Sequence, residues 1–180
     1  MRFVVSGPSG SGKTTIIRML KKELMPIKFS VSATDRPPRP DEVDGINYYF
    51  LSREEFQRKI DHSEFLEYVE LENRYGTLWS EIEITSGDII LDLDVTGALK
   101  IREHFPDAIL IFIAPPSMEE LERRLRARND GMAESEVKQR LLRAERELAC
   151  KELYDCVIIN DSLQQAFEDV LNVIKKSGKQ

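Results

Sequence analysis

The stretch Phe3–Thr15, which reads FVVSGPSGSGKTT, decides the fold. It begins with a short apolar run, Phe3–Val5, that is typical of a buried strand. The next residues, Gly7–Thr14, match the pattern G-x-x-x-x-G-K-S/T at every fixed position. A helix is predicted after them, because apolar residues follow at the spacing of one helical face: Ile16, Ile17, Leu20 and Leu24. The order of strand, glycine-rich loop and helix predicts a nucleotide phosphate site.

The chemistry of this loop is anion capture. Glycines let the backbone turn tightly, so that consecutive N–H groups point at one place. The positive N-terminal end of the following helix adds to the attraction. Lys13 supplies a charge for the β- and γ-phosphates, and the Thr14 hydroxyl is placed for Mg²⁺. The predicted phosphate contacts are Gly7, Pro8, Ser9, Gly10, Ser11, Gly12, Lys13, Thr14 and Thr15.

Length and composition indicate one globular domain with room for small inserted lobes. The chain has 180 residues, of which 41% are hydrophobic and 32% are charged. Its 26 basic and 32 acidic residues give a net charge of −6, which argues against a dedicated nucleic-acid-binding protein. The local arginine clusters fit a small anionic ligand better.

The sequence also predicts a cytoplasmic protein that has no membrane segment. No apolar run approaches the roughly 20 residues that cross a bilayer. The N-terminus leads directly into the first predicted strand, so we expect no signal peptide. Cys150 and Cys156 lack the spacing of a metal site or of a C-x-x-C motif. We interpret them as buried thiols in a reducing compartment.

Alternating strands and helices predict an α/β core, a parallel sheet flanked by helices, built from residues 1–31 and 81–180. Near-continuous apolar runs, typical of strands buried in such a sheet, occupy residues 88–94, 108–113 and 156–160. Asp92 and Asp94 stand two apart, so both side chains are predicted to leave one face at the C-terminal end of their strand. Open α/β sheets bind their ligands at that end, which predicts Mg²⁺ or ligand contacts here.

Residues 32–80 are predicted to form a small β-rich insert with one helix. Alternating or aromatic-rich segments predict strands over residues 28–32, 47–51 and 65–71. Ser52 and Glu55 have the spacing of a capping box, which predicts the start of the helix. The insert interrupts an otherwise regular alternation of strands and helices.

The loop Ala33–Asp44, which reads ATDRPPRPDEVD, is the most unusual part of the insert. Its prolines make it stiff and exposed rather than part of a regular element. A charged surface loop is one interpretation. The other is that the prolines reduce the entropy lost when Arg36 and Arg39 close on a ligand.

Residues from about 121 to 146 are predicted to form two arginine-rich helices joined by a glycine-containing turn. One interpretation is a solvated helix pair that is held by Glu–Arg pairs one turn apart. The other is a mobile cover over phosphates, with Arg124, Arg128 and Arg140 as its cations. Arg124 and Arg128 lie one turn apart and are predicted to face the same way.

These blocks together resemble the guanylate kinase family over essentially the whole chain. The matching stretches, in chain order, are GPSGSGKTT, SVSATDRPPRPDEVDGINYYF, FLEYVE, YGT, ILDLDVTG, FIAPPSMEELERRLRAR and VIIND. The resemblance implies a P-loop kinase fold in which the insert binds GMP and the arginine-rich hairpin is a helical lid. It implies transfer of the γ-phosphate of ATP, as co-substrate, to GMP with the help of Mg²⁺, giving ADP and GDP.

The resemblance also implies roles for individual residues. The residues that would supply positive charge to neutralise the moving phosphoryl group are Lys13, Arg124, Arg128 and Arg140. Thr14 would hold Mg²⁺, and Asn160 would contact the adenine end of ATP. GMP contacts are implied for Ser32, Arg36, Arg39, Tyr48, Glu67, Tyr75, Thr77, Asp92 and Asp94.

The chemistry of the implied GMP contacts is sensible. Arg36 and Arg39 can fork onto a phosphate, and tyrosine hydroxyls can donate to the same oxygens. Glu67 would read the base, because a carboxylate accepts from guanine N1–H and the N2 amino group at once, whereas adenine has a bare N1. Hydroxyls of Ser32 and Thr77 can donate to guanine O6. A further guanine contact is implied for Asp94, and a contact to guanine or to Mg²⁺-bound water is implied for Asp92.

Three positions depart from the pattern that the resemblance implies. Asp35 puts a carboxylate beside the phosphate clamp, where it would repel GMP if it pointed inward and would be a loop charge if it pointed outward. Thr96 stands in place of the usual Gln, and Asn129 in place of a common Gly.

Two other functions are compatible with this fold. One is a kinase for a different nucleoside monophosphate, for which Glu67 together with Thr77 argues against AMP. A non-catalytic guanylate-kinase-like module that binds a protein partner is disfavoured by the intact Lys13 and hairpin arginines. We expect GMP and ATP as partners, no nucleic acid, no membrane, and a monomer or a small homo-oligomer.

Overall fold

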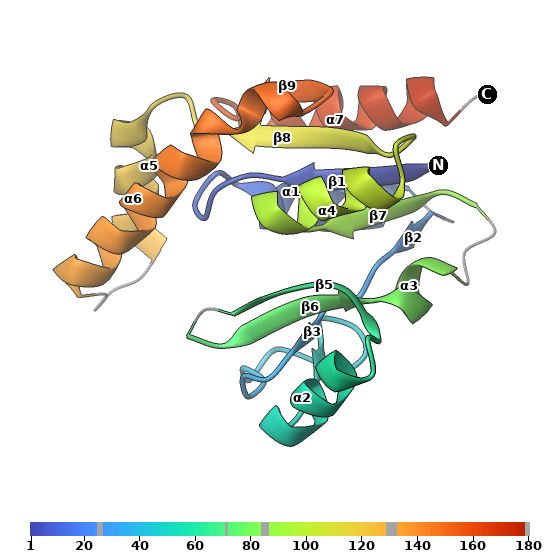
Figure 1. Cartoon of the computed structure of the whole chain (residues 1–180). Coiled ribbons are helices and arrows are strands. Elements are labelled where there is room, and N and C mark those ends of the chain that lie inside the picture. Colours follow the sequence, from blue (N-terminus) through green and yellow to red (C-terminus); the bar gives the residue numbers. More distant parts are fainter. Residues whose placement is uncertain (25–26, 71, 84–86, 129–132, 179–180) are drawn as a thin grey trace.

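A computed structural model describes residues 1–24, 27–70, 72–83, 87–128 and 133–178 of the chain. The core is a sheet with the strands β1 (Arg2–Ser6), β2 (Lys28–Phe29), β7 (Ile89–Asp92), β8 (Ile109–Ala114) and β9 (Cys156–Ile159). Its strand order is β2-β7-β1-β8-β9, and each neighbouring pair is parallel (Figure 1). The C-terminal ends of these strands therefore all meet at one edge, which is where such sheets bind ligands.

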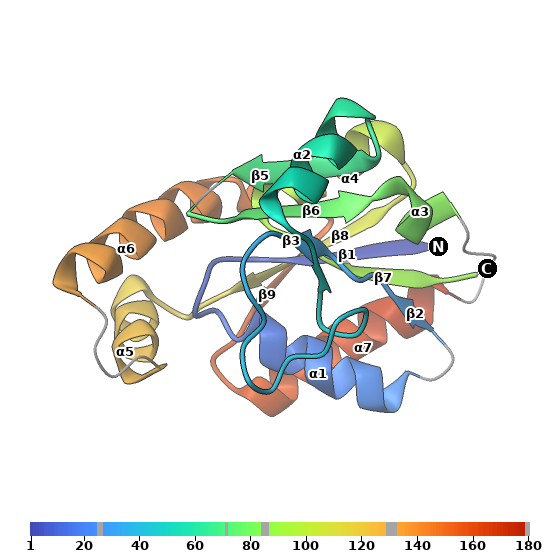
Figure 2. The ribbon, with the colours of Figure 1, turned by 90° about the horizontal axis from the view of Figure 1, so that it is seen from below.

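Helices α1 (Lys13–Glu23) and α7 (Leu163–Ser177) pack on one face of this sheet, and α4 (Val95–His104) packs on the other. Helices α5 (Met118–Arg128) and α6 (Glu134–Ala149) pack on each other as a hairpin that projects beyond the sheet, and the short 3₁₀ helix η1 (Lys151–Leu153) follows α6 (Figure 1). Successive side chains of β1 alternate between the faces: Phe3 and Val5 pack with residues of α1 and α7, whereas Val4 packs with residues of α4. Figure 2 shows α1 and α7 together on one side and α4 on the other. Burial on both faces explains the near-continuous apolar runs.

A second, mixed sheet lies below the core sheet in Figure 1, and its Leu66 packs with residues of α4 in the core. Its strands are β3 (Ala33–Thr34), β4 (Tyr49–Phe50), β5 (Phe65–Glu70) and β6 (Arg74–Leu78), in the order β4-β3-β6-β5. Helix α2 (Arg53–Asp61) packs on it through Phe56, whose ring stacks on Phe65 at a centroid distance of 4.5 Å. Ser52 and Glu55 form the predicted capping box at the start of α2.

The predicted fold class is confirmed: a parallel sheet flanked by helices, with a small separate sheet inserted into it. All strands of the second sheet lie between Ala33 and Leu78. The predicted division into residues 1–31 with 81–180, 32–80, and a lid at about 121–146 stays a prediction about domains.

Several predicted strands are shorter than the sequence pattern suggested. β2 ends at Phe29, although the Ser30 N–H still donates to the Ile90 carbonyl at 3.0 Å; the Val31 N–H, which faces away from β7, donates to the Glu81 carboxylate at 3.0 Å. The predicted strand 47–51 contracts to Tyr49–Phe50. β7 ends at Asp92, so Asp94 is not a strand residue but the N-cap of α4. The prediction that Asp92 and Asp94 leave one face of one strand is therefore wrong.

Glu81, on the short helix α3 (Trp79–Glu83), ties the two sheets together. Its carboxylate is buried and accepts from the Val31 N–H at 3.0 Å and from the Tyr49 hydroxyl at 2.9 Å. Lys28 donates to the Glu81 carbonyl at 3.0 Å. The carboxylate thus joins the chain entering the insert, the insert itself and the chain leaving it.

Two expectations concern the membrane and the cysteines. Among the described residues, no helix is both long enough and apolar enough to cross a bilayer. Cys150 and Cys156 are free thiols that are half-buried, so the expectation of fully buried thiols is wrong.

Candidate active site

The glycine-rich loop is a backbone cradle that admits no side chain at its first and last glycines. A Cβ at Gly7 would lie 2.2 Å from the Ile113 carbonyl oxygen, and one at Gly12 would lie 2.1 Å from Asn160 Nδ2. Both glycines have a positive φ, at 144° and 94°. The Gly12 carbonyl accepts the first hydrogen bonds of α1, from Thr15 and Ile16, so the helix N-terminus faces the loop.

Lys13 is the first residue of α1, and its ammonium group pairs with the carboxylate of Asp92 at the end of β7. Burial lowers the pKa of Lys13, but the Asp92 carboxylate outweighs it, and the pKa is raised above its ordinary value. Lys13 is therefore a fixed positive charge at the carboxyl edge of the core sheet. A phosphate group carries the same sign of charge as the Asp92 carboxylate and could take its place beside Lys13.

A cavity of about 900 Å³ opens above the loop and reaches the insert and the α5–α6 hairpin. It brings together these predicted site residues: Gly7, Pro8, Ser9, Gly10, Gly12, Lys13, Thr14, Thr15, Tyr48, Tyr75, Asp94, Arg124 and Arg140. The cavity thus joins the phosphate loop, two tyrosines of the insert and two hairpin arginines. Figure 2 shows β5 and β6 on one side of this region and the hairpin beside it.

The other predicted site residues whose side chains the structure describes do not line this cavity. Ser11, Arg36, Glu67, Thr77 and Asn160 are buried, Asp92 and Ser32 are half-buried, and Arg39 is exposed. Arg128 ends α5, and its side chain lies outside the described part of the chain.

Asn160 braces the phosphate loop from behind. Its side-chain amide donates to the Ser11 carbonyl at 2.7 Å, and its side chain is buried. Arg124 donates to the Asn160 carbonyl at 2.9 Å and to Glu120 at 2.7 Å. The base of the hairpin is therefore attached to the residue that supports the loop, which couples their positions.

In the insert, Arg36 is held by Glu42. Its guanidinium forms two hydrogen bonds to the Glu42 carboxylate, at 2.6 and 2.7 Å, and a third to the Pro37 carbonyl at 2.9 Å. Hydrogen bonding from Arg36 lowers the pKa of Glu42 to about 2. The same carboxylate accepts from the Arg39 backbone N–H at 2.9 Å, so the stiff loop is folded around one charge pair.

Glu67 and Thr77 form a buried pair across β5 and β6. The Thr77 hydroxyl donates to Glu67 Oε1 at 2.8 Å, and Glu67 is 5% exposed. Burial raises the pKa of Glu67 to about 7; the Thr77 hydrogen bond opposes that rise and the nearby charge of Asp94 adds to it. With its proton directed at Glu67, Thr77 must rotate its hydroxyl before it can donate to a guanine O6.

Asp35 points away from the cavity. Its carboxylate accepts from the backbone N–H and from Nε of Arg74, at 2.7 and 2.6 Å. Burial alone would raise the pKa of Asp35, but the hydrogen bonds from Arg74 prevail and lower it. Of the other two departures from the family pattern, Thr96 is an exposed residue of α4 and Asn129 lies outside the described residues.

Some hairpin arginines have exposed carboxylate partners within the hairpin. Arg140 pairs with Glu136 of its own helix at 2.8 Å, and Arg126 pairs with Glu122 of its own helix and with Glu134 of α6, each at 2.7 Å. These are the exposed pairs of a solvated helix, as the first interpretation expected. Arg124 and Arg140 also line the cavity, so both are placed as the other interpretation, a cover over phosphates, requires.

Sequence reasoning missed several residues that shape the site. Glu42, Arg74 and Glu81 hold the insert, and Arg143 of α6 donates to Asp94 at 3.0 Å. Arg143 follows Arg140 by three residues, so helical spacing could have placed it near the same face. No motif links Arg74 and Glu81 to partners that are distant in the chain, and Glu42 meets Arg36 only through the course of the loop between them.

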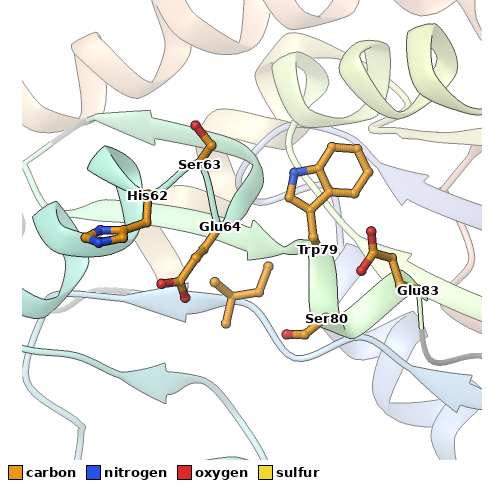
Figure 3. Close-up of a pocket in the computed structure, with 7 residues that line it drawn as sticks. His62, Ser63, Glu64, Trp79, Ser80 and Glu83 are labelled. Carbon is orange, nitrogen blue, oxygen red and sulfur yellow. The ribbon is translucent and has the colours of Figure 1, made fainter.

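A second, smaller pocket of about 330 Å³ lies at the junction of α2, β5 and α3 (Figure 3). The residues that line it are His62, Ser63, Glu64, Leu78, Trp79, Ser80 and Glu83. None of them is a lysine or an arginine, and two are glutamates, so this pocket does not suit a phosphate.

The fold and the larger cavity define a small P-loop kinase: a phosphate loop that faces a separate sheet and an arginine-rich helical hairpin. A sequence model described as guanylate kinase matches residues 1–177. A guanylate kinase of Fusobacterium nucleatum is 42% identical over 181 residues, covering 98% of this chain and 97% of that protein. One of Salinibacter ruber is 45% identical over 178 residues, covering 96% and 94%.

Solved structures agree with the sequence comparisons. The crystal structure of guanylate kinase from Anaplasma phagocytophilum matches with a TM-score of 0.81 and 31% identity, over 100% of this chain and 87% of that one. The chain belongs to the guanylate kinase family. The resemblance seen in the sequence, and the enzyme class that it implied, are thereby confirmed.

Proposed function

We propose that this chain transfers the γ-phosphate of ATP to GMP. An oxygen of the GMP phosphate attacks the γ-phosphorus, the bond from that phosphorus to the bridging oxygen breaks, and ADP leaves while GDP forms. The observation that carries the proposal is the single cavity that joins the phosphate loop to the insert tyrosines and the hairpin arginines. ATP and GMP can therefore bind side by side in one cavity.

On the donor side, the loop and α1 hold the ATP phosphates. The backbone N–H groups and the N-terminus of α1 attract the anion, and Lys13 exchanges its Asp92 partner for phosphate oxygens. Arg124 lines the cavity while it is bonded to the carbonyl of Asn160, so its charge reaches the transferred group from a supported position. These charges act by neutralising the transition state, and no covalent intermediate on the protein is needed.

On the acceptor side, Arg36, Arg39, Tyr48 and Tyr75 bind the phosphate of GMP. Glu42 already orients the Arg36 guanidinium, which lowers the entropy lost on binding. The Tyr48 and Tyr75 rings meet edge to face at a centroid distance of 5.9 Å and both line the cavity, so we assign both hydroxyls to the phosphate of GMP.

Guanine is recognised by Glu67, with Ser32, Thr77, Asp92 and Asp94 around it. The Glu67 carboxylate accepts from N1–H and the N2 amino group of guanine, and Thr77 fixes its orientation. An adenine base would leave this buried acceptor without a donor, which disfavours AMP by roughly 10⁴.

The donor set fits a magnesium ion that is shared with the substrate. Mg²⁺ prefers oxygen ligands and is bound by few protein groups together with substrate phosphates. The described residues contain no cluster of three or more His, Cys, Asp or Glu side chains that could hold a metal by themselves. The Thr14 hydroxyl, which lines the cavity, is the protein ligand that we propose. When bound, the ion neutralises charge on the β- and γ-phosphates.

The proposal is tested by ADP release from ATP and Mg²⁺ with GMP, AMP, CMP, UMP or no acceptor. We expect release that depends on GMP and is lost in Lys13→Ala. Turnover that prefers another monophosphate would contradict the assignment of the acceptor. A folded protein that binds GMP but turns over no acceptor would contradict the kinase reaction and support a binding module.

A further inference from the structure

Arg143 connects the hairpin to the opposite wall of the site. It lies on α6, lines the large cavity and donates through Nη2 to Asp94 Oδ2 at 3.0 Å. Its Nε donates to Glu147 Oε1 at 2.7 Å, so the guanidinium is held from both sides. Arg140, by contrast, pairs with Glu136 of its own helix. Arg143 therefore forms a contact between α6 and the start of α4.

Asp94 in turn lies against the carboxylate that is proposed to read guanine. Its Oδ1 accepts from the Gly97 backbone N–H at 2.8 Å, which caps α4. A Cβ on Gly97 would lie 3.0 Å from Glu67 Oε2 and 3.4 Å from Asp94 Oδ1. The carboxylates of Glu67 and Asp94 thus both lie beside Gly97. Asp94, which Arg143 holds, is therefore a neighbour of Glu67, which is proposed to contact the base.

The charges around Glu67 come from three elements. Thr77 of β6 donates to its carboxylate, Asp94 at the start of α4 disfavours its ionised form, and Lys100 of α4 favours that form. The Arg143 cation of α6 partners Asp94 directly. Without Arg143, the charge of Asp94 is uncompensated beside a buried acceptor that must be ionised to accept both guanine donors.

We propose that Arg143 is a positioning residue for guanine recognition: it holds and neutralises Asp94, and so couples the lid helix α6 to Glu67. The inference rests on the proposed function, because it assigns Glu67 to the base of GMP. Its consequence is that movement of the hairpin and binding of GMP favour each other, as reciprocal coupling between two sites requires. Arg143 thereby differs from Arg124 and Arg140, which are proposed to act on the transferred phosphate.

A double-mutant cycle tests this role. GMP is titrated by calorimetry, without ATP, into the wild type, Arg143→Gln, Asp94→Asn and the double variant. Because the contact is a charge-assisted hydrogen bond, we expect Arg143→Gln to raise the Kd for GMP about tenfold. In the Asp94→Asn background the same change should raise it less than twofold. Arg146→Gln, an exposed arginine of the same helix, is the matched control and should change the Kd less than twofold.

Two further readouts separate positioning from a general structural role. Arg143→Lys keeps the positive charge and should restore part of the affinity. The pH at which GMP binding is half lost on acidification should move upward in Arg143→Gln, because uncompensated Asp94 favours protonation of Glu67. Circular dichroism of each variant checks that it is folded.

Two results would overturn the inference. One is an equal loss of GMP affinity from Arg143→Gln in both backgrounds, since Arg143 then acts independently of Asp94. The other is a lower kcat with an unchanged Kd for GMP, since Arg143 then serves the transferred phosphate. The cycle needs only GMP binding, so it decides the role of Arg143 separately from the turnover assay that tests the kinase reaction.

Discussion

The insert and the hairpin hold their charges in opposite ways. In the insert, the Asp35 side chain is 4% exposed and pairs with Arg74, and the Arg36 side chain is 10% exposed and pairs with Glu42. In the hairpin, the side chains of the Arg140–Glu136 pair are 37% and 47% exposed. A buried pair is costly to break, whereas an exposed pair contributes about 0–1 kcal/mol and exchanges partners easily.

The difference assigns two tasks to two regions. The insert keeps a fixed arrangement of buried charges, which suits recognition of one base. The hairpin keeps Arg140 on a weak, exposed partner that phosphate oxygens can replace, which suits a charge that acts only when ATP is bound. Lys13 of the core lines the same cavity as residues of the insert and of the hairpin.

The largest effect is expected at Lys13. Lys13→Ala removes the fixed charge at the phosphate loop and should lower kcat about a thousandfold, the loss that follows removal of one preorganised transition-state contact. Steady-state ADP release with GMP and Mg-ATP measures it. Lys22→Ala, an exposed lysine at the end of the same helix, is the control and should leave kcat unchanged. A kcat within tenfold of the wild type contradicts the role of Lys13.

Breaking the buried Asp35–Arg74 pair of the insert should lower stability and leave activity nearly unchanged. Asp35→Ala leaves Arg74 without its carboxylate, and we expect the free energy of unfolding to fall by about 3 kcal/mol. Urea denaturation measures the change, with the exposed Asp41→Ala as a control that should cost less than about 0.5 kcal/mol. The KM for GMP should stay within twofold, because Asp35 points away from the cavity. A lower KM would show that its charge acts on the phosphate.

Recognition by Glu67 should depend on pH. Its pKa is raised to about 7, and guanine needs the ionised form as acceptor, so affinity for GMP should rise as pH increases through 7. Between pH 6 and pH 8 the ionised fraction grows about tenfold, and the Kd should fall by about that factor. The phosphate of GMP itself titrates near pH 6, as phosphate monoesters do. Glu67→Gln retains only that titration and is the reference; identical profiles would contradict the assignment.

The smallest effect is expected in the hairpin. Glu136→Gln removes the exposed partner of Arg140 and should change the free energy of unfolding by less than about 0.5 kcal/mol. Thermal denaturation of the variant beside the wild type measures it. A loss above 1 kcal/mol would mean that the hairpin pairs are structural and would remove the contrast between the two regions.

The sequence predicted the core more accurately than the insert, for a physical reason. Strand β1, the glycine-rich loop and α1 follow one another in the chain, so local periodicity and a motif with fixed spacing define them. The short strands β3 and β4 pair with partners far along the chain, and contacts such as that of the Tyr49 hydroxyl with Glu81 help to hold them in place. No local pattern reports such a contact.

The same distinction holds for the site residues. The loop from Gly7 to Thr15 could be predicted because its chemistry is contained in consecutive residues. The partners of the predicted residues could not: Glu42 beside Arg36, Arg74 beside Asp35, and Arg143 beside Asp94. Each pair depends on the course of a loop or on the approach of a helix, and only the folded chain brings its members together.

Calorimetric titration of GMP into the wild type, Glu67→Gln and Arg140→Gln, without ATP, tests the central contrast most directly. We predict that Glu67→Gln raises the Kd for GMP about a hundredfold, because a buried acceptor for two guanine donors is lost. Arg140→Gln should bind GMP within twofold of the wild type although it turns over more slowly. Glu70→Gln, an exposed glutamate of the same strand, is the control for Glu67 and should bind like the wild type. Equal losses of affinity in Glu67→Gln and Arg140→Gln would contradict the separation of recognition from catalysis.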